Sequence, residues 1–279
     1  MLSWGMAPRV ALVLGKPPRA GTIIADVRER LESRDIATTV HVPSVTGVSP
    51  TERRGLAEAD LVVHRGLSEQ FQPLLRELAE TGVDLCNPWT SRRDRGARSR
   101  ALLGAGIPTP EFLTVSTWEE VLEMAEASPV VAKAAAAGRG SGVVAGWAGG
   151  APGRPADSRR ALLPPEPPGA GPYVVEQFVE HDGNDRKLYV AGDTVFGLLK
   201  PSTLTQGHVT RGRRFPVPAL LRDLALEATA ALDLHLAGID VVEDQEARPW
   251  VVDVNEFPGY RSVEGAAQAV ATHLIRHLD

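Results

Sequence analysis

The chain has 279 residues, of which 43% are hydrophobic and 23% are charged, a composition typical of a globular protein with a large core. Its net charge of -5 argues against a nucleic-acid-binding protein, and its single cysteine excludes an internal disulfide. The start of the chain shows no secretory signal pattern, and no apolar stretch approaches the ~20 residues that cross a bilayer. We therefore expect a cytoplasmic protein without a membrane partner.

The first third of the chain alternates strands with helices. Apolar strands are predicted at residues 9–15, 37–43, 59–66 and 83–88, and helices at residues 22–33 and 71–82. This alternation predicts a doubly wound parallel sheet over residues 1–88. Ligands of such sheets collect beyond the carboxyl ends of the strands, where His64 and Arg65 lie. We predict these two residues as substrate contacts; the alternative is that they are surface loop residues.

The middle of the chain, residues 89–172, is predicted to form a second unit. Its predicted elements are a basic helix ending near residue 104, an extended segment at 106–115, a helix at 117–127, and two strands around a glycine-rich loop at 129–147. Lys133 ends the first of these strands and precedes AAAAGRGSG. A lysine beside such a loop can neutralise phosphate oxygens while the loop amides hold them. Residues 149–172 are dense in proline, glycine and alanine, which predicts a long mobile connection.

The last third, residues 173–279, is predicted to be rich in strands. The predicted elements are a strand at 173–180, two strands joined by a turn at 192–193, a helix at 218–235, strands at 237–242 and 248–255, and a terminal helix at 264–278.

The strand WVVDVN carries a candidate metal site. Asp253 and Asn255 are two residues apart, so both side chains point to the same face of the strand, and Pro258-Gly259 ends the strand behind them. Asp240 in the neighbouring segment AGIDVV adds a second carboxylate. Carboxylate and amide oxygens suit Mg2+ or Mn2+. The alternative is an Asx-type turn in which Asp253 and Asn255 satisfy only local backbone groups.

Several separated motifs, taken in order, resemble the ATP-grasp superfamily. They are the lysine with its glycine-rich loop, VVEQFVE, GIDVV and VDVNEFPGY, together with CNPWTSRRDRGARSRALLGAGIPTP. The resemblance covers about residues 87–279. It implies an α/β ATP-grasp fold, with an N-terminal doubly wound parallel-sheet domain at 1–88 and two α+β subdomains, 89–172 and 173–279, that clasp the nucleotide.

The resemblance also implies roles for individual residues. ATP would be bound by Arg95 and Lys133 at the phosphates, by Gly138, Gly140 and Gly142 in the loop above them, by Glu176, Gln177, Phe178 and Val179 at the adenine, and by Glu180 at the ribose. Arg95 stands where relatives usually carry lysine, and arginine keeps the charge but not the compact shape.

Metal, catalytic and substrate roles complete the implied site. The implied residues are Asp240, Asp253 and Asn255 for Mg2+ or Mn2+, Lys187 and Lys200 for catalysis, and His64, Arg65, Lys187 and Arg261 for substrate.

Two ATP-grasp chemistries remain open. In ligases such as the bacterial enzymes that add glutamate, a carboxylate attacks the terminal phosphate of ATP, and an amine then opens the acylphosphate to form an amide or peptide bond. Lys187 stands where those ligases carry an arginine on the substrate-facing strand. The substrates would then be a small-molecule or peptide carboxylate and an amine.

The segments EHDGNDRKLYVAGDTVFGLLKPS and DVNEFPGYRSV also resemble inositol-trisphosphate kinases, which phosphorylate a polyol phosphate. The scarcity of cationic residues for a polyphosphate favours the ligase. A third possibility, a non-catalytic nucleotide-binding module, is disfavoured because all three metal ligands are present.

Overall fold

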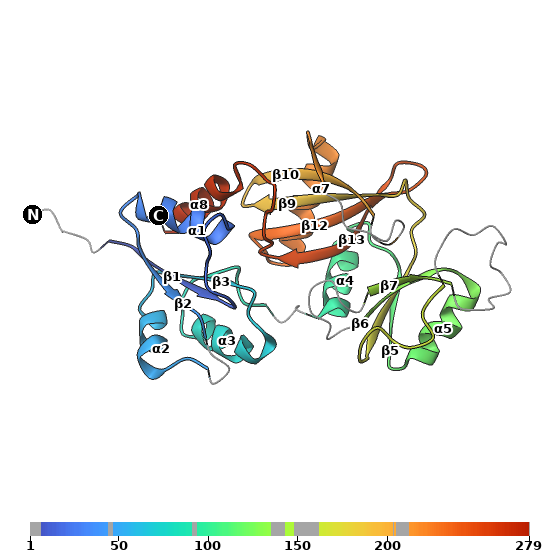
Figure 1. Cartoon of the computed structure of the whole chain (residues 1–279), viewed down its shortest axis with the longest axis horizontal. Coiled ribbons are helices and arrows are strands. Elements are labelled where there is room, and N and C mark those ends of the chain that lie inside the picture. The colour runs from blue at the N-terminus through green and yellow to red at the C-terminus, as the bar shows by residue number, and fades with distance from the viewer. Residues whose placement is uncertain are drawn as a thin grey trace, which may run out of the picture.

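The protein is described from a computed structural model, which covers residues 7–43, 47–90, 94–134, 143–147, 162–202, 204 and 212–278. These residues form three sheets, here called the first, second and third sheets in chain order (Figure 1). None of the helices in these ranges is both long enough and apolar enough to span a bilayer.

The first sheet is fully parallel, with strand order β2-β1-β3-β4, which confirms the predicted doubly wound arrangement. Helix α2 was not expected from the sequence pattern because it buries only Leu56; a capping box of Ser49 and Glu52 starts it. The elements are β1 (Arg9–Leu14), α1 (Ile23–Glu32), β2 (Ala37–His41), α2 (Pro50–Ala57), β3 (Leu61–Arg65), η1 (Glu69–Phe71), α3 (Gln72–Glu80) and β4 (Leu85–Cys86).

The second sheet is antiparallel, with strand order β5-β8-β6-β7. Helix α4 precedes it and α5 packs into its core. The elements are α4 (Arg95–Gly104), β5 (Phe112–Val115), α5 (Trp118–Ala127), β6 (Val130–Ala134), β7 (Val143–Gly146) and β8 (Tyr173–Gln177).

The predicted mobile connection over residues 149–172 lies partly outside the described residues, which resume at 162. From there on the prediction is wrong. Leu163 is only 5% exposed and belongs to the core of the second sheet, and Trp118 Nε1 donates to the carbonyl of Pro164 at 3.2 Å. Apolar burial and this hydrogen bond anchor the segment that leads into β8.

The third sheet is antiparallel, with strand order β11-β10-β9-β12-β13. The predicted turn at Gly192 joins β9 to β10, and α7 covers one face of the sheet through a buried apolar cluster. The elements are β9 (Asn184–Ala191), β10 (Thr194–Pro201), β11 (Arg213–Phe215), α7 (Ala219–Ala231), β12 (Leu236–Glu243), β13 (Pro249–Glu256) and α8 (Ala266–Arg276).

The C-terminal helix α8 packs against the helix α1 of the first sheet. Figure 1 shows α8 beside α1, and Val270 and Leu274 of α8 lie in one buried cluster with Val27 and Leu31 of α1. The predicted domain boundary at residue 88 therefore separates two sheets that share a core cluster. The boundaries themselves remain predictions.

Candidate active site

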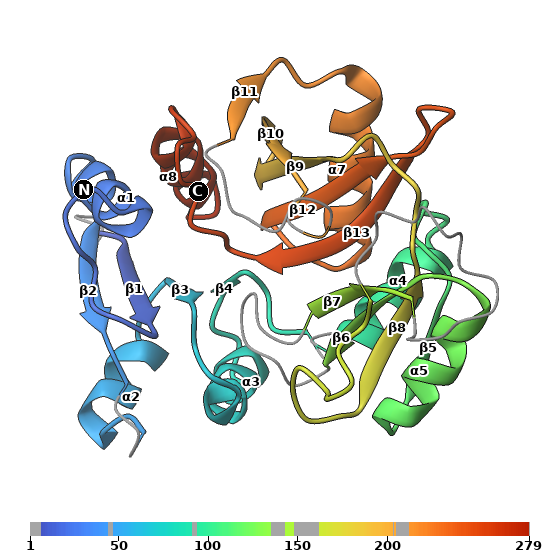
Figure 2. The ribbon, with the colours of Figure 1, turned by 45° about the vertical axis from the view of Figure 1, so that its right-hand side comes forward.

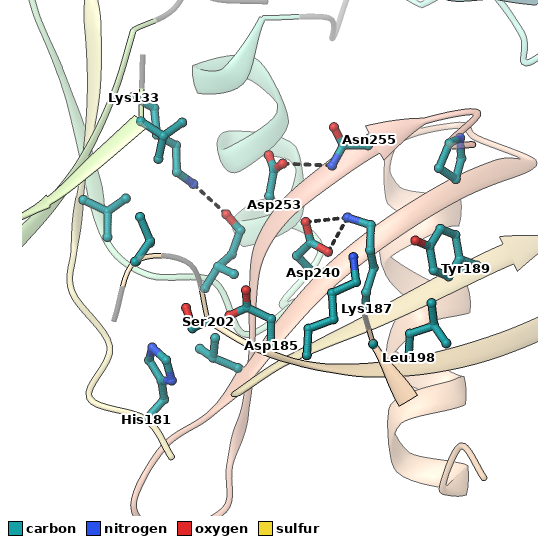
Figure 3. Close-up of a pocket in the computed structure, with 18 of the residues that line it drawn as sticks. Lys133, His181, Asp185, Lys187, Tyr189, Leu198, Ser202, Asp240, Asp253 and Asn255 are labelled. Carbon is teal, nitrogen blue, oxygen red and sulfur yellow. Dashed lines mark hydrogen bonds and ion pairs between the residues drawn. The ribbon is translucent and has the colours of Figure 1, made fainter. Parts of the chain in front are cut away.

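A cavity of about 990 Å3 is lined by residues of the second and third sheets and by Arg65 at the end of β3. Figure 2 shows β13 of the third sheet close to β6 and β7 of the second, and Figure 3 shows the side chains between them. Thirteen of the predicted site residues line this cavity: Arg65, Arg95, Lys133, Glu176, Gln177, Phe178, Val179, Lys187, Lys200, Asp240, Asp253, Asn255 and Arg261.

Charged residues at paired positions of three neighbouring strands line one side of the cavity. Lys187 of β9 pairs with Asp240 of β12, which in turn pairs with Asp253 of β13. Side chains at paired positions of neighbouring strands lie on the same face. Lys187 Nζ lies 2.6 Å from Oδ1 and 2.8 Å from Oδ2 of Asp240 (Figure 3). Burial lowers the pKa of Lys187, but the Asp240 carboxylate outweighs it and the pKa is raised, so this lysine is charged at neutral pH.

A β-bulge in β13 provides a hydrogen-bond contact between the second and third sheets. Asp240 pairs with Asp253 and Val241 with Val251, so Val252 is an extra residue on β13. The carbonyl of Val252 accepts a hydrogen bond from Lys133 Nζ at 2.6 Å. The bulge thus turns a backbone oxygen of the third sheet toward the lysine of the second.

Lys133 also pairs with a carboxylate of its own sheet. Lys133 Nζ lies 2.6 Å from Glu176 Oε2, and the two side chains are only 7% and 5% exposed. Burial raises the pKa of Glu176, and the charge of Lys133 opposes that shift. Glu176 lines the cavity as predicted, but its carboxylate is turned toward Lys133.

The first turn of α4 brings Arg95 to the metal candidates. The side chain of Asp94 caps this helix by accepting from the backbone N–H of Ala97 at 2.8 Å. Arg95 follows directly, and its Nη1 lies 3.6 Å from Asp253 Oδ1. Burial would raise the pKa of Asp253, but Lys133, Arg95 and Lys187 outweigh it and lower the pKa. Asp253 is therefore an ionised carboxylate at neutral pH.

The donor set of Asp240, Asp253 and Asn255 fits a hard divalent cation. All three residues line the cavity, and the amide Nδ2 of Asn255 donates to Asp253 Oδ2 at 2.9 Å. That bond orients the amide and leaves its oxygen as the atom suited to a cation. The Asx-turn alternative does not hold, because β13 runs through both residues to Glu256.

Two of the predicted site residues that the structure describes, His64 and Glu180, are not part of this lining. His64 is 5% exposed and its Nε2 lies 2.8 Å from the carbonyl oxygen of Asn87, so it is buried away from the cavity and its substrate contact stays a prediction. Glu180 is exposed and does not line the cavity, so the structure gives its ribose role no support. Gly138, Gly140 and Gly142 lie outside the described residues.

The cavity also contains residues that the sequence analysis did not single out. Asp185 and Tyr189 lie two positions before and after Lys187 on β9, and the alternation of a strand places all three on one face. That alternation was the signal available for them. His181, Ser202 and Glu256 also line the cavity, and no comparable pattern points to them.

Comparison with known proteins agrees with this geometry. A family model described as the inositol 1,3,4-trisphosphate 5/6-kinase ATP-grasp domain matches residues 202–276. Over 97% of this chain and 99% of the other, the fold is similar to the crystal structure of a RimK domain protein ATP-grasp from Sphaerobacter thermophilus, with a TM-score of 0.69 and 24% identity. The chain therefore has the fold of ATP-grasp enzymes.

Two further proteins similar to this chain are informative. The ATP-grasp ligase PsnB, solved with a minimal precursor, Mg and ADP, matches with a TM-score of 0.67 at 16% identity and covers 97% of each chain. The probable alpha-L-glutamate ligase 2 of Hahella chejuensis is 27% identical over 207 residues, which are 69% of this chain and 65% of that protein. The chain therefore spans just under two thirds of that relative's length.

Proposed function

We propose that this ATP-grasp protein is an ATP-dependent ligase that joins a carboxylate to an amine. One observation carries the proposal. Lys187, Asp240 and Asp253 form a continuous charged row on the third sheet, opposite Lys133 of the second sheet and Arg95 of α4. Acids and cations placed on two facing surfaces suit a metal–nucleotide complex held between them.

The lining of the cavity divides into regions suited to different parts of ATP. The apolar side chains Val131, Phe178, Val179 and Val242 provide walls for a planar base. Lys133 and Arg95 lie where they would contact the phosphates. Mg2+ bound by Asp240, Asp253 and Asn255 would neutralise phosphate charge during transfer.

The reaction that we propose forms an acylphosphate. An oxygen of the substrate carboxylate attacks the terminal phosphorus of ATP, and ADP leaves with the electrons of the broken bond. The nitrogen of an amine then attacks the acyl carbon, inorganic phosphate leaves, and the amine loses a proton as the amide forms. Arg65, Lys200 and Arg261 line the same cavity and would hold the substrate carboxylate.

The charge balance of the cavity favours this ligase over a polyol-phosphate kinase. The charged side chains among the described lining residues are Arg65, Arg95, Lys133, Lys187, Lys200 and Arg261 against Glu176, Asp185, Asp240, Asp253 and Glu256. This set is nearly neutral, whereas a polyphosphate substrate needs a clear excess of cations. Relatives named as probable glutamate ligases support the same choice.

A kinase is the second candidate because the inositol trisphosphate kinase family model matches residues 202–276, which include the metal candidates. In that reaction a hydroxyl replaces the carboxylate as the attacking group. An acylphosphate then never forms, and the phosphate stays on the product.

An isotope experiment separates the two reactions. The protein is incubated with ATP, Mg2+ and either 18O-carboxylate amino acids with amine partners or inositol phosphates. A ligase transfers one 18O from the carboxylate to inorganic phosphate, and hydroxylamine traps the acylphosphate as a hydroxamate. Phosphorylated inositol without release of phosphate would overturn the ligase. Nucleotide binding without turnover of any substrate in either panel would favour a binding module.

A further inference from the structure

A second group of metal-type ligands lies outside the cavity. Cys86 ends β4, His235 immediately precedes β12, and His273 lies on α8. One ligand atom from each of these three side chains lies within 4.8 Å of the other two. None of the three lines the large cavity described above.

We propose that Cys86, His235 and His273 bind Zn2+ or a similar late first-row divalent cation, with His277 as the fourth ligand. Thiolate sulfur and imidazole nitrogen are the ligands that such cations prefer, and four-coordinate sets of cysteine and histidine are typical of structural zinc sites. The proposal concerns a site separate from the Mg2+ candidates, and it does not depend on the proposed ligase activity.

Unsatisfied imidazole nitrogens support the assignment. Nδ1 of His235 and Nε2 of His273 are buried, and neither finds a hydrogen-bond partner within the described ranges. Buried polar atoms without a partner are rare in native proteins, and a bound ion is one of the few explanations for them. Two such atoms on neighbouring rings beside the one cysteine indicate a shared partner.

The arrangement of the rings fits a tetrahedral site. The ring centre of His235 lies 5.1 Å from that of His273 and 5.3 Å from that of His277. The ring centres of His273 and His277 are 5.9 Å apart. A Zn–N bond of ~2.1 Å with tetrahedral angles places imidazole centres roughly 5 Å apart. His273 lies on α8 and His277, four residues later, is the C-cap residue of that helix, so the two side chains lie on the same side of its last turn. In the proposed site the His277 side chain turns toward the other three ligands to complete the set.

The thiol of Cys86 is inert without a cation. Burial raises the pKa of this thiol to about 12, so the sulfur is protonated at neutral pH. A bound divalent cation favours the thiolate, so formation of the metal–sulfur bond releases the thiol proton to solvent. A surface cavity of about 340 Å3, lined by Gly192 and His273 among others, reaches one of the proposed ligands.

The ligands come from three distant parts of the chain. Cys86 belongs to the first sheet, His235 leads into the third, and His273 belongs to the helix that packs on α1. A cation bound to all three would hold these parts together only in the native state. Binding therefore raises the thermal midpoint without any need for ATP.

The test uses tag-free protein that is treated with a chelator, returned to buffer with excess Mg2+, and titrated with Co2+. Because the chain has one cysteine, a thiolate-to-cobalt charge-transfer band can arise only from Cys86. We expect such a band to saturate at one equivalent and to disappear when Zn2+ is added. A wild-type spectrum without this band overturns the proposal, whether or not any variant folds.

Variants then assign the ligands. We expect Cys86→Ser to abolish the band, and His235→Gln and His273→Gln to weaken Zn2+ binding at least about tenfold, with a smaller loss for His277→Gln. His41→Gln on β2 is the matched control, and its Zn2+ affinity should equal that of the wild type. Equal affinities for His273→Gln and His41→Gln would show that the histidine cluster is ordinary packing.

Discussion

The ammonium of Lys133 lies 2.6 Å from the carboxylate of Glu176, and both side chains are almost fully buried. Together with the bond from Lys133 to the Val252 carbonyl, this pair holds one wall of the cavity in place. A lysine that binds phosphate in the proposed reaction is thus also part of the framework of the site. Mutation can separate its role in binding phosphate from its role in the ion pair with Glu176.

Replacing Lys133 by methionine should reduce both stability and ATP affinity. The change leaves the Glu176 carboxylate buried without its cation, which costs about 3 to 5 kcal/mol in the free energy of unfolding. Adding Glu176→Gln should restore much of the stability but none of the ATP affinity. Chemical denaturation and calorimetric titration with ATP measure the two effects, with the exposed Lys16→Met as control. Full ATP affinity in the double variant would remove Lys133 from the nucleotide site.

Replacing Asp253 by asparagine keeps the shape of the side chain and removes its charge. If this residue holds Mg2+, turnover should fall by about a hundredfold or more, because the metal contributes several kcal/mol to phosphoryl transfer. The Mg2+ concentration that gives half-maximal rate should rise as well. Steady-state rates over a series of Mg2+ concentrations test both expectations, and an unchanged Mg2+ dependence would contradict the assignment.

The amide of Asn87 links the first sheet to the third. Its Oδ1 accepts from the backbone N–H groups of His235 at 2.8 Å and Leu236 at 2.7 Å, and its Nδ2 donates to the carbonyl of Leu236 at 2.9 Å. Asn87→Ala leaves these buried groups without partners and should lower the free energy of unfolding by about 3 kcal/mol.

The matched control for that variant is Asn184→Ala, whose side chain bonds to Asp182 two residues away. Its loss should stay within about 1 kcal/mol. Urea denaturation of both variants compares them directly. Equal losses would mean that the bridge made by Asn87 adds nothing to stability.

Asp244 should make stability depend on pH in a defined acidic range. Desolvation raises the pKa of Asp244, but hydrogen bonds from Trp250 and Arg248 outweigh it and lower the pKa to about 2. A folded-state pKa below the unfolded value stabilises the protein above about pH 4. That stabilisation is lost as the pH falls toward 2.

Comparison of the wild type with Asp244→Asn tests this expectation. The difference between their thermal midpoints should be largest above pH 4 and should shrink as the pH approaches 2. A difference that stays constant between pH 5 and pH 2 would show that the charge of Asp244 does not stabilise the fold.

Sequence patterns were sufficient for features that depend on neighbours along the chain. Strand alternation placed Asp253 and Asn255 on one face, and the order of motifs placed Lys133 and Arg95 in the same site. The pairing of Lys133 with Glu176 depends on β6 lying beside β8, which are separated by β7 and a long connection. The bulge at Val252 depends on the register between β12 and β13, which no local pattern encodes.

Two further differences between the sequence patterns and the structure have a similar cause. His64 lies next to the end of a parallel strand, where ligands usually lie, but it is buried and its ring bonds to the backbone of Asn87. The proline-rich composition before Pro172 argued for a loose connection, yet Leu163 finds a place in an apolar core that was assembled from distant strands. In both cases tertiary contacts decide the environment of the residue.

The packing of α8 on α1 has a consequence for synthesis on the ribosome. The first sheet and α1 leave the exit tunnel early, but Val27 and Leu31 of α1 gain Val270 and Leu274 as neighbours only after some 240 further residues have been translated. Until then the nascent chain presents part of an apolar surface to its surroundings. We expect chaperones that recognise apolar surface to bind ribosome-attached chains truncated before residue 266 more strongly than chains that include α8.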